Sequence, residues 1–248
     1  MQSVTILGSG NAFNTSGRAH TCFYLQSDEG GALLLDCGAT SLMRLQQARI
    51  SLDTIDTILL THFHGDHFGG LPFLLLQMQL IDQRRRPILI AGPPGLAECC
   101  RELMQCMYPG FEFTLEINWQ VVQPTEDDCR LRNQSCFAVQ AVSVLHRPES
   151  LAYRIQNGRQ TIAFSGDTAW GAALIRLVEH VDLALLELSL PEQPADPVSH
   201  ISLAEALEVH NQLAARRIVW THCYDELAEQ ARVHGLEVAW DGMRIPLA

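Results

Sequence analysis

The stretch that most constrains this 248-residue chain is residues 61–67, which read Thr-His-Phe-His-Gly-Asp-His. It places three imidazoles and a carboxylate within a few positions, directly after an apolar run. Histidine with aspartate is a common ligand set for zinc. Side chains alternate along an extended chain, so His62 and His64 would point the same way and could hold one ion. Asp66 and His67 follow a glycine turn and could serve a second ion.

The overall charge argues against a broad electrostatic grip on nucleic acid. The formal net charge is −11 and the sequence pI is about 5.3, whereas sequence-independent binding to nucleic acid needs a basic face. Bound divalent cations would still make a local pocket far more positive than the whole chain. Arg18 and Arg147 could steer an anion, although each is more simply a surface residue. Residues 84–86, three consecutive arginines, are expected to form a solvated loop, with an anion-attracting patch as the alternative.

Hydropathy and cysteine usage predict a cytoplasmic protein with no membrane partner. The chain is 47% hydrophobic, which suffices for a sizeable core, and no apolar run approaches the roughly 18 residues of a membrane helix. No basic-then-apolar leader precedes the apolar run that begins at Val4, so no secretory signal is expected. The eight cysteines include no CxxC pair, which argues against a cysteine zinc site or redox dithiol and fits a reducing compartment.

Short apolar runs alternate with helical patterns along the whole chain, and no linker or low-complexity segment divides it. The strands expected are residues 4–7, 22–26, 32–35, 56–60, 88–91, 111–123, 135–145, 151–155, 161–164, 183–188, 217–220 and 237–245. The helices expected are residues 39–48, 68–81, 96–107, 169–178, 203–214 and 225–233. A single α/β domain over residues 1–248, with sheets inside and helices outside, is the simplest architecture.

Three further residues of metal-binding type follow predicted strands, namely His146, Asp167 and His222. Strand ends are where a rigid scaffold presents side chains to a site. Each residue alone has an ordinary alternative: a surface histidine, a helix-capping aspartate and a packing histidine. Their recurrence at strand ends, together with residues 61–67, favours one shared site.

In this order, these residues resemble the metallo-β-lactamase superfamily across essentially the whole chain. The His-x-His-x-Asp-His run over residues 62–67 is highly specific, and Ser-Gly-Asp-Thr at 165–168 and Thr-His at 221–222 complete the pattern. The resemblance implies an αββα sandwich, an α/β fold in which two mixed sheets lie face to face with helices on both outer faces. The metal site would lie at one edge, between the sheets.

The resemblance also implies two divalent metal ions. Zinc is the expected metal, although manganese or iron could occupy the same ligands. The implied ligands are His62, His64 and His146 for the first ion, and Asp66, His67 and His222 for the second. Asp167 would bridge both ions. Asp36 resembles the superfamily's aspartate that orients a ligand imidazole; its alternative is a turn-forming residue.

The distal half of the chain resembles the ribonuclease Z and cyclic-phosphodiesterase branch. Glu187, followed by His200 in a His-x-Ser-x-x-Glu segment, is similar to a pair in which a glutamate supports a histidine that protonates the leaving group. By this resemblance His200 is the general acid and Glu187 orients it, and Asp66 completes the predicted catalytic residues. The alternative is that His200 belongs only to a capping segment, with Ser202 as the helix N-cap.

One departure from that branch limits the range of expected substrates. Ribonuclease Z proper inserts a flexible tRNA-gripping arm between its equivalents of His146 and Asp167, where this chain has only a predicted hairpin. Glu187 also lies in Leu-Glu-Leu-Ser rather than His-Glu-Ala-Thr. With a net charge of −11, these features argue against tRNA. They favour a small phosphodiester substrate, of cyclic nucleotide or cyclic ribosyl phosphate type, attacked by a hydroxide that bridges the two metals.

Two other functions stay open. The same hydroxide could attack a carbonyl, which would make the chain a hydrolase of a carbon ester, thioester, lactone or β-lactam. The chain could also be a non-catalytic, metal-stabilised accessory protein, although an intact ligand set argues against this. The sequence leaves the oligomeric state open, a homodimer included.

Overall fold

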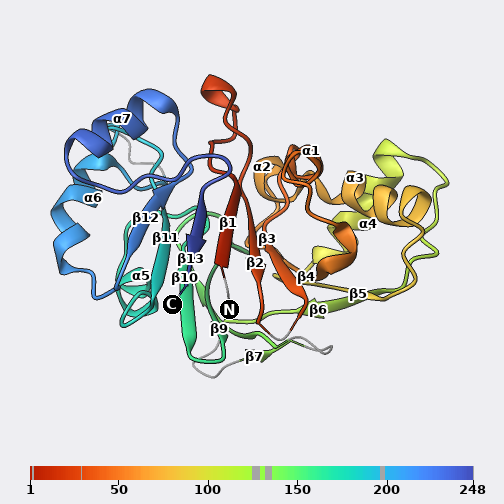
Figure 1. Ribbon diagram of the computed structural model, residues 1–248. Helices are drawn as coiled ribbons and strands as arrows, with labels where there is room; N and C mark the ends of the chain where they lie inside the picture. The colour runs from red at the N-terminus through yellow and green to blue at the C-terminus, as the bar shows by residue number, and fades with distance from the viewer. Residues whose placement is uncertain (2, 29, 125–128, 132–135, 196–198, 248) are drawn as a thin grey trace.

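Two β-sheets form the centre of the molecule (Figure 1). The computed structural model describes residues 1, 3–28, 30–124, 129–131, 136–195 and 199–247. The strands are β1 (Ser3–Gly8), β2 (Cys22–Gln26), β3 (Ala32–Leu35), β4 (Ile55–Leu59), β5 (Ile88–Gly92), β6 (Ile117–Val121), β7 (Cys129–Arg130), β8 (Ala138–Ser143), β9 (Leu151–Asn157), β10 (Gln160–Phe164), β11 (Leu183–Glu187), β12 (Ile218–Thr221) and β13 (Arg244–Pro246). One sheet has the order β13-β1-β2-β3-β4-β5-β6 and the other β12-β11-β10-β9-β8-β7.

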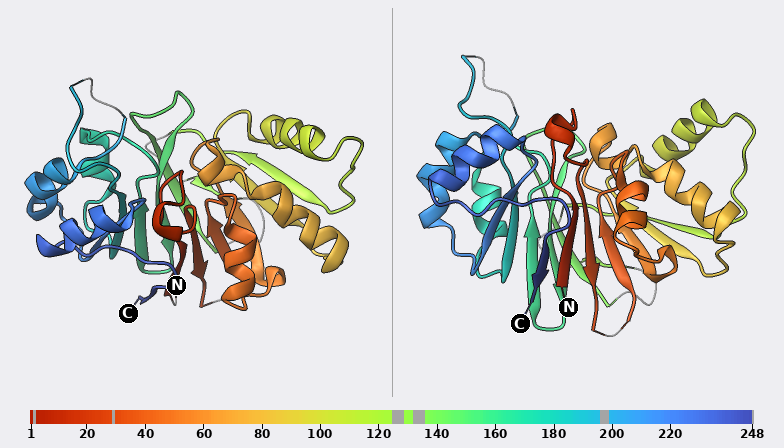
Figure 2. Two further views of the ribbon diagram at one scale, coloured as in Figure 1. Left: turned by 90° about the horizontal axis from the view of Figure 1, so that it is seen from above. Right: turned by 45° about the horizontal axis from the view of Figure 1, so that its top comes forward.

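Helices cover the outer face of each sheet. They are α1 (Ser41–Gln47), α2 (Gly65–Phe68), α3 (Leu71–Leu76), α4 (Leu96–Met107), α5 (Ala172–Leu177), α6 (Leu203–Val209) and α7 (Asp225–Val233), with short turns η1 (Thr15–Gly17), η2 (Leu52–Thr54), η3 (Gln77–Ile81) and η4 (His210–Gln212). Figures 1 and 2 show α1 to α4 beside the seven-stranded sheet and α5 to α7 beside the six-stranded one. The predicted αββα sandwich is confirmed.

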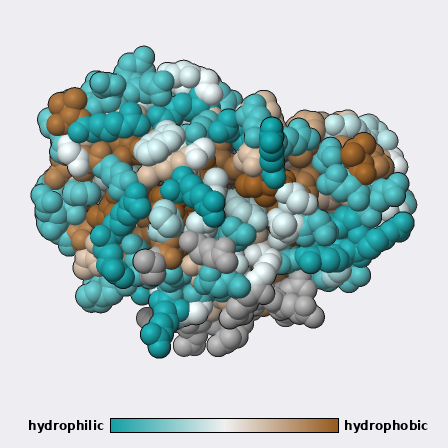
Figure 3. Space-filling view, in the orientation of Figure 1, coloured by the Kyte–Doolittle hydropathy of each residue, from teal (hydrophilic) through white to brown (hydrophobic). Residues whose placement is uncertain are grey.

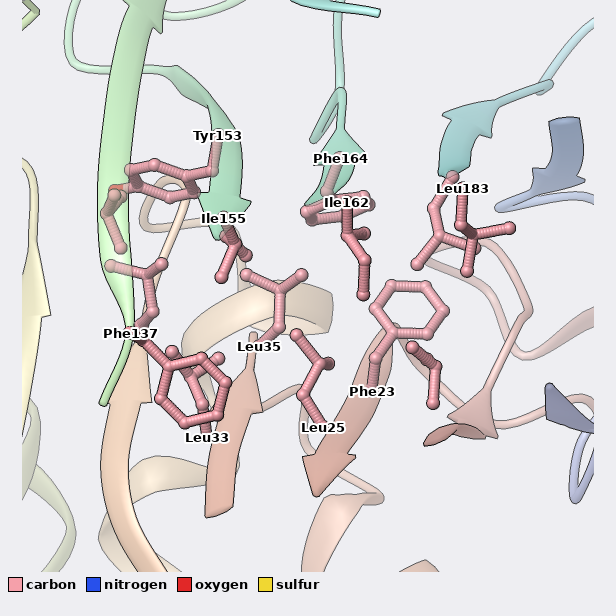
Figure 4. Packing of buried hydrophobic residues seen from close by; sticks show 14 of the residues in the cluster. Phe23, Leu25, Leu33, Leu35, Phe137, Tyr153, Ile155, Ile162, Phe164 and Leu183 are labelled. Carbon is pink, nitrogen blue, oxygen red and sulfur yellow. The ribbon is translucent and has the colours of Figure 1, made fainter. Parts of the chain in front are cut away.

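The core between the sheets explains why the strands read as continuous apolar runs. Leu33 and Leu35 of β3 point into the space between the sheets, whereas Leu34 packs under the helices on the outer face. Both faces of such a strand are covered, so both must be apolar. Phe23 of β2 meets Phe164 of β10 across the sandwich, with ring centroids 5.1 Å apart (Figure 4).

Parallel pairing gathers the ends of several strands at one rim. β3 to β6 run parallel, as do β10 to β12. The carboxyl ends of parallel strands lie at the same edge of a sheet, where open α/β sheets hold their ligands. The α2 helix, labelled near the top of Figure 1, follows β4 at this rim.

The helix predicted over residues 68–81 is wrong as a single element. The α2 turn ends at Phe68, α3 begins at Leu71, and residues 77–81 form a π-helical turn. The break falls at Gly70, where a Cβ atom would lie 2.1 Å from the carbonyl oxygen of Gly38. The close approach of these two backbones therefore requires glycine at the junction of the two helices.

Two predicted strands are much shorter than expected. Residues 111–116 form a loop because the amides of Thr114 and Leu115 donate to the Gln79 side chain rather than to a strand. Of the strand predicted over 237–245, only β13 forms, because the chain turns ahead of β13. At this turn the Asp241 carboxylate accepts hydrogen bonds from the main-chain amides of Ser9 and Ala19, in the loop after β1. In the strand predicted over 135–145, β8 spans Ala138–Ser143, and residue 135 lies outside the described residues.

Two arginines expected at the surface are buried. Arg84 is 8% exposed, and its guanidinium donates to the carbonyl oxygens of Leu52, Arg86 and Pro87. The prediction that residues 84–86 form a solvated loop is therefore wrong for Arg84. Arg18 is 7% exposed, bonded to Ser9 and paired with Asp225, and therefore fastens a loop. Arg147 is exposed, as expected for a surface residue.

The surface in the view of Figure 1 is largely hydrophilic, with small apolar patches between the polar residues (Figure 3). Within the described part of the chain, none of the helices has the length and hydropathy that a membrane crossing requires.

We expect Phe23→Ala to lower the free energy of unfolding by about 3–5 kcal/mol, because it removes a buried ring from the contact between the sheets. Phe13→Ala is the matched control, since that ring is 85% exposed and its loss should change stability by no more than about 0.5 kcal/mol. Chemical denaturation of both variants measures the difference. Equal stabilities would contradict this account of the core.

Candidate metal centre

The rim brings the seven predicted metal ligands together in two clusters that share one residue. Within each cluster, one ligand atom from every residue lies within 4.8 Å of the others. The first cluster is His62, His64, His146 and Asp167. The second cluster is Asp66, His67, Asp167 and His222. This is the division that the family resemblance implied.

Asp167 faces both clusters, one carboxylate oxygen to each. Its Oδ2 lies 3.9 Å from Nε2 of His62 and 3.9 Å from Nε2 of His146. Its Oδ1 lies 3.0 Å from Nε2 of His67 and 3.4 Å from Nε2 of His222. A carboxylate so placed can bridge two cations.

The local backbone explains how residues 61–67 divide between the clusters. His64 is extended (φ −67°, ψ 146°), so His62 and His64 project to one side. Phe63 projects the other way and packs against Phe68, with ring centroids 5.7 Å apart. The α2 turn then begins, and its first residues carry the buried Asp66 and His67 into the second cluster.

Hydrogen bonds on the far side of each ring set the orientation of four site imidazoles. The Nδ1 atom of His62 lies 3.0 Å from Thr61 Oγ1, and that of His67 lies 2.7 Å from Asp36 Oδ2. The Nδ1 atom of His146 lies 3.1 Å from the Ser199 carbonyl oxygen, and that of His222 lies 2.8 Å from Ser189 Oγ. Such partners fix the tautomer of a ligand imidazole and leave Nε2 directed at the metal. His64 is the exception, because its Nδ1 faces inward, 3.1 Å from His146 Nε2.

Asp36 makes the contact that was expected of it. Its carboxylate accepts from the Thr61 amide at 2.8 Å and from the Thr61 hydroxyl, and it holds His67. Asp36 and His222 both have positive φ angles (57° and 63°), which are unfavourable for residues with a Cβ. Strained backbone of this kind persists where surrounding structure over-determines it, and often at functional sites.

The side chains fit a divalent cation. His62 Nε2, His67 Nε2 and Asp167 Oδ1 are buried and make no properly aligned hydrogen bond, whereas nearly all buried polar atoms have a partner. These are the atoms directed into the clusters. Burial lowers the pKa of His62 to about 2, so its ring is neutral and can donate a lone pair. Neutral imidazole with carboxylate is a donor set typical of zinc.

The two carboxylates of the second cluster, with that of Asp36 beside it, also call for a positive charge. Asp36, Asp66 and Asp167 are all at most 5% exposed. Burial alone would lower the pKa of His67, but the neighbouring Asp167 and Asp36 carboxylates outweigh it and raise that pKa. A proton on this ring can therefore compensate the carboxylates, and metal binding would displace it.

His200 and Glu187 lie beside both clusters. His200 Nδ1 is 3.0 Å from Glu187 Oε2, and its ring lies 5.0 Å from that of His146 and 6.0 Å from that of His222. Burial lowers the pKa of His200, but the hydrogen bond and charge of Glu187 outweigh it and raise that pKa to about 9. The Glu187 carboxylate therefore favours the protonated form of the ring.

The alternative assigned to the segment after His200 is also present in the structure. Ser202 caps α6 in a reciprocal capping box with Glu205. The cap fixes the start of the helix immediately after His200, so it positions the histidine. Ser202 is thus the N-cap, as that alternative has it, and His200 is also bonded to Glu187.

One side of the centre is open. His64 is exposed, and 26% of the His200 side chain is accessible. The histidines of the second cluster are at most 4% exposed. A substrate would therefore approach from the side of the first cluster and His200.

The sequence did not identify Ser189, whose hydroxyl contacts both Glu187 and His222. A signal was present, because Ser189 stands two positions after Glu187, and such residues share a face of an extended segment.

Comparison with known proteins gives the class of the chain. Residues 2–238 match the family model described as Anti-Pycsar protein Apyc1. The chain belongs to this family. It is 27% identical over 270 residues to a ribonuclease Z of Methanothermobacter thermautotrophicus, covering 90% of this chain and 86% of that protein. It is 34% identical over 138 residues to the zinc phosphodiesterase ELAC protein 1 of Mus musculus, which covers 54% of this chain and 37% of that protein.

A solved structure shows the same fold for this Apyc1-family chain. The metallo-β-lactamase fold protein YhfI from Bacillus subtilis superposes with a TM-score of 0.81 at 20% identity, covering 99% of both chains. The fold and the relatives make the chain a metal-dependent hydrolase of the metallo-β-lactamase fold, in the ribonuclease Z and phosphodiesterase branch. The zinc phosphodiesterase relative and the two clusters support divalent metal binding.

We expect Asp167→Asn to weaken metal binding at both clusters, because the residue belongs to both. His64→Ala should affect only the first cluster, and His67→Ala only the second. Metal content after dialysis against dilute zinc, measured by mass spectrometry, should fall further for Asp167→Asn than for either histidine variant. His234→Ala, an exposed histidine at the end of α7, is the control. Retention of the full metal content by Asp167→Asn would contradict the shared role of this residue.

Proposed function

We propose that the chain hydrolyses small phosphodiesters, of cyclic nucleotide or cyclic ribosyl phosphate type, at two divalent metals, with zinc expected in both positions. The first metal would be held by His62, His64 and His146 and the second by Asp66, His67 and His222, and Asp167 would contribute to both sites. The observation that carries the proposal is the His200–Glu187 pair beside both clusters. A protonated histidine there answers the main demand of phosphodiester cleavage, which is a proton for the departing oxygen.

The reaction can be followed through the residues of the chain. Bound divalent metals supply Lewis acidity and make water a competent nucleophile near neutral pH. Water attacks phosphorus and gives up a proton to the solvent, which later reprotonates His200; one new P–O bond forms and the bond to the departing oxygen breaks. His200 gives its Nε2 proton to that oxygen, because Nδ1 is held by Glu187. Glu187 keeps the ring oriented and stabilises its charged form.

The preference for attack at phosphorus rather than at a carbonyl carbon rests on the general acid His200 and on the ribonuclease and phosphodiesterase relatives. An alkoxide leaving phosphorus is strongly basic and benefits from protonation, whereas a thiolate leaving a thioester does not need it, so the acid favours a phosphodiester over a thioester. The preference over an ester, a lactone or a β-lactam rests on the relatives. The relatives named above are a ribonuclease and a phosphodiesterase. Both cleave the P–O bond of a diester.

The preference for a small substrate rests on the segment between His146 and Asp167. Residues 147–166 are all described, and they consist of a short turn and the β9–β10 hairpin. No projecting arm occurs within them. The net charge of −11 also disfavours an extended polyanion such as tRNA.

A substrate panel on zinc-loaded protein tests the proposal. It comprises a cyclic nucleotide, bis(p-nitrophenyl) phosphate, a precursor tRNA, a lactone, a glutathione thioester and a cephalosporin. Asp167→Ala serves as the control for contaminating activity. We expect turnover of the first two compounds that this variant loses. Turnover of a carbonyl compound with no phosphodiester hydrolysis would reject the proposal, and cleavage of the precursor tRNA with no action on the cyclic nucleotide would reject the small-substrate part.

For His200→Ala, we expect the loss of activity to depend on the leaving group. Loss of a positioned acid should slow hydrolysis of a phenyl diester by about 10²–10⁴-fold. The matching diester in which p-nitrophenol replaces phenol as the leaving group should be much less affected, because p-nitrophenolate leaves without a proton. Steady-state rates with the two diesters measure this, and equal losses would contradict the acid role.

The pH profile should report on Glu187. An acid must carry its proton, so activity should fall as pH rises through the raised pKa of His200. Glu187→Gln removes the charge that raises this pKa and leaves the effect of burial. The alkaline limb should then move to lower pH by about one unit or more. Glu208→Gln, an exposed position on α6, is the control. If activity falls at the same alkaline pH in Glu187→Gln as in the wild-type protein, Glu187 does not set the acidity of His200.

A further inference from the structure

We propose that Ser189 is a positioning residue that couples the acid pair to the second metal cluster, an inference that rests on the proposed function. Its Oγ lies 2.6 Å from Glu187 Oε2 and 2.8 Å from His222 Nδ1. Glu187 in turn holds His200. A single hydroxyl therefore contacts the partner of the general acid and a residue assigned to the metal.

The chemistry of the groups fixes the direction of these hydrogen bonds. An ionised carboxylate can only accept, so the Ser189 hydroxyl donates its one proton to Glu187. The same oxygen can then only accept from His222, which must carry its proton on Nδ1. When the ring is neutral, the lone pair is therefore on Nε2, the atom that lies 3.1 Å from Asp66 Oδ2 and 3.4 Å from Asp167 Oδ1. The hydroxyl thus selects the tautomer that suits a metal ligand.

Glu187 depends on the hydroxyl for its own orientation. The side chain is fully buried. Its Oε1 accepts from the Thr168 amide and its Oε2 from the Ser189 hydroxyl, and His200 Nδ1 lies 3.2 Å from Oε1 and 3.0 Å from Oε2. Without the hydroxyl, Oε2 would lose a neutral donor and the carboxylate could rotate away from His200. A buried hydrogen-bond network that loses one member destabilises the remaining members.

The backbone holds Ser189 where both contacts are possible. Glu187 ends β11, and the next two amides donate outside that strand, from Leu188 to the Thr221 carbonyl and from Ser189 to the Ile201 carbonyl. These bonds fasten Ser189 between the segment that carries His222 and the segment that carries His200. The hydroxyl therefore lies on a rigid frame.

The test uses full-length protein with Ser189→Ala and Ser189→Thr. Threonine retains the hydroxyl and suits extended backbone. Ser51→Ala is the matched control, because it removes a serine hydroxyl that caps η2, away from the rim. Two properties are measured for each protein: zinc affinity by competition with a chromogenic chelator, and rates with the phenyl and p-nitrophenyl diesters.

We expect Ser189→Ala to weaken zinc binding by roughly 10- to 100-fold, the range for partners of metal ligands. We also expect a greater loss of rate, at saturating zinc, on the phenyl diester than on the p-nitrophenyl diester. Ser189→Thr should restore both properties, and Ser51→Ala should change neither. In a His200→Ala background, Ser189→Ala should add no further leaving-group dependence, because its effect on leaving-group protonation passes through His200.

Each other outcome overturns the inference. Unchanged zinc affinity rejects the link to His222, and equal losses on the two diesters reject the link to the acid pair. Failure of Ser189→Thr to rescue shows that the effect is one of packing. Absence of diester hydrolysis by the wild-type protein would reject the proposed function itself, and the coupling with it, whereas the zinc affinity would still show separately whether Ser189 orients His222.

Discussion

The structure around the centre depends on the burial of Asp167 between two sets of imidazoles. The carboxylate is 3% exposed and directs one oxygen to each cluster. A buried charge is costly unless it is paired, so the neighbouring rings, and the cations they would hold, are what make this position tenable. Gly166 delivers the carboxylate through a turn of positive φ, where a Cβ would come within 3.1 Å of Thr61 and of the Leu151 carbonyl oxygen.

Much of the centre was predictable because its signals are local. Residues 61–67 carry their own periodicity, and the extended segment followed by a turn was readable from the order of residues. The other metal-type residues follow strongly apolar strands, so their position at a rim was predictable as well. The sandwich itself followed from the family resemblance, supported by alternating strands and helices. Helices over 96–107 and 225–233 occur as predicted, because their apolar spacing is regular.

What escaped prediction depends on partners far away in the chain. Arg18 looks like a surface residue until Asp225 and Asp241 are seen beside the loop that contains it. Ser189 is one hydroxyl among many, and its role appears only when Glu187 and His222 meet over it. Residues 111–116 have strand-like composition, but a glutamine side chain from η3 takes two of their amides. Such contacts override local propensity.

The central claim is that two metals act together across Asp167. The most direct test is a zinc titration of metal-free protein, with hydrolysis of bis(p-nitrophenyl) phosphate followed at each addition. The account predicts that most of the activity appears as the second equivalent of zinc binds. Full activity after the first equivalent, or activity that is independent of zinc, would contradict it.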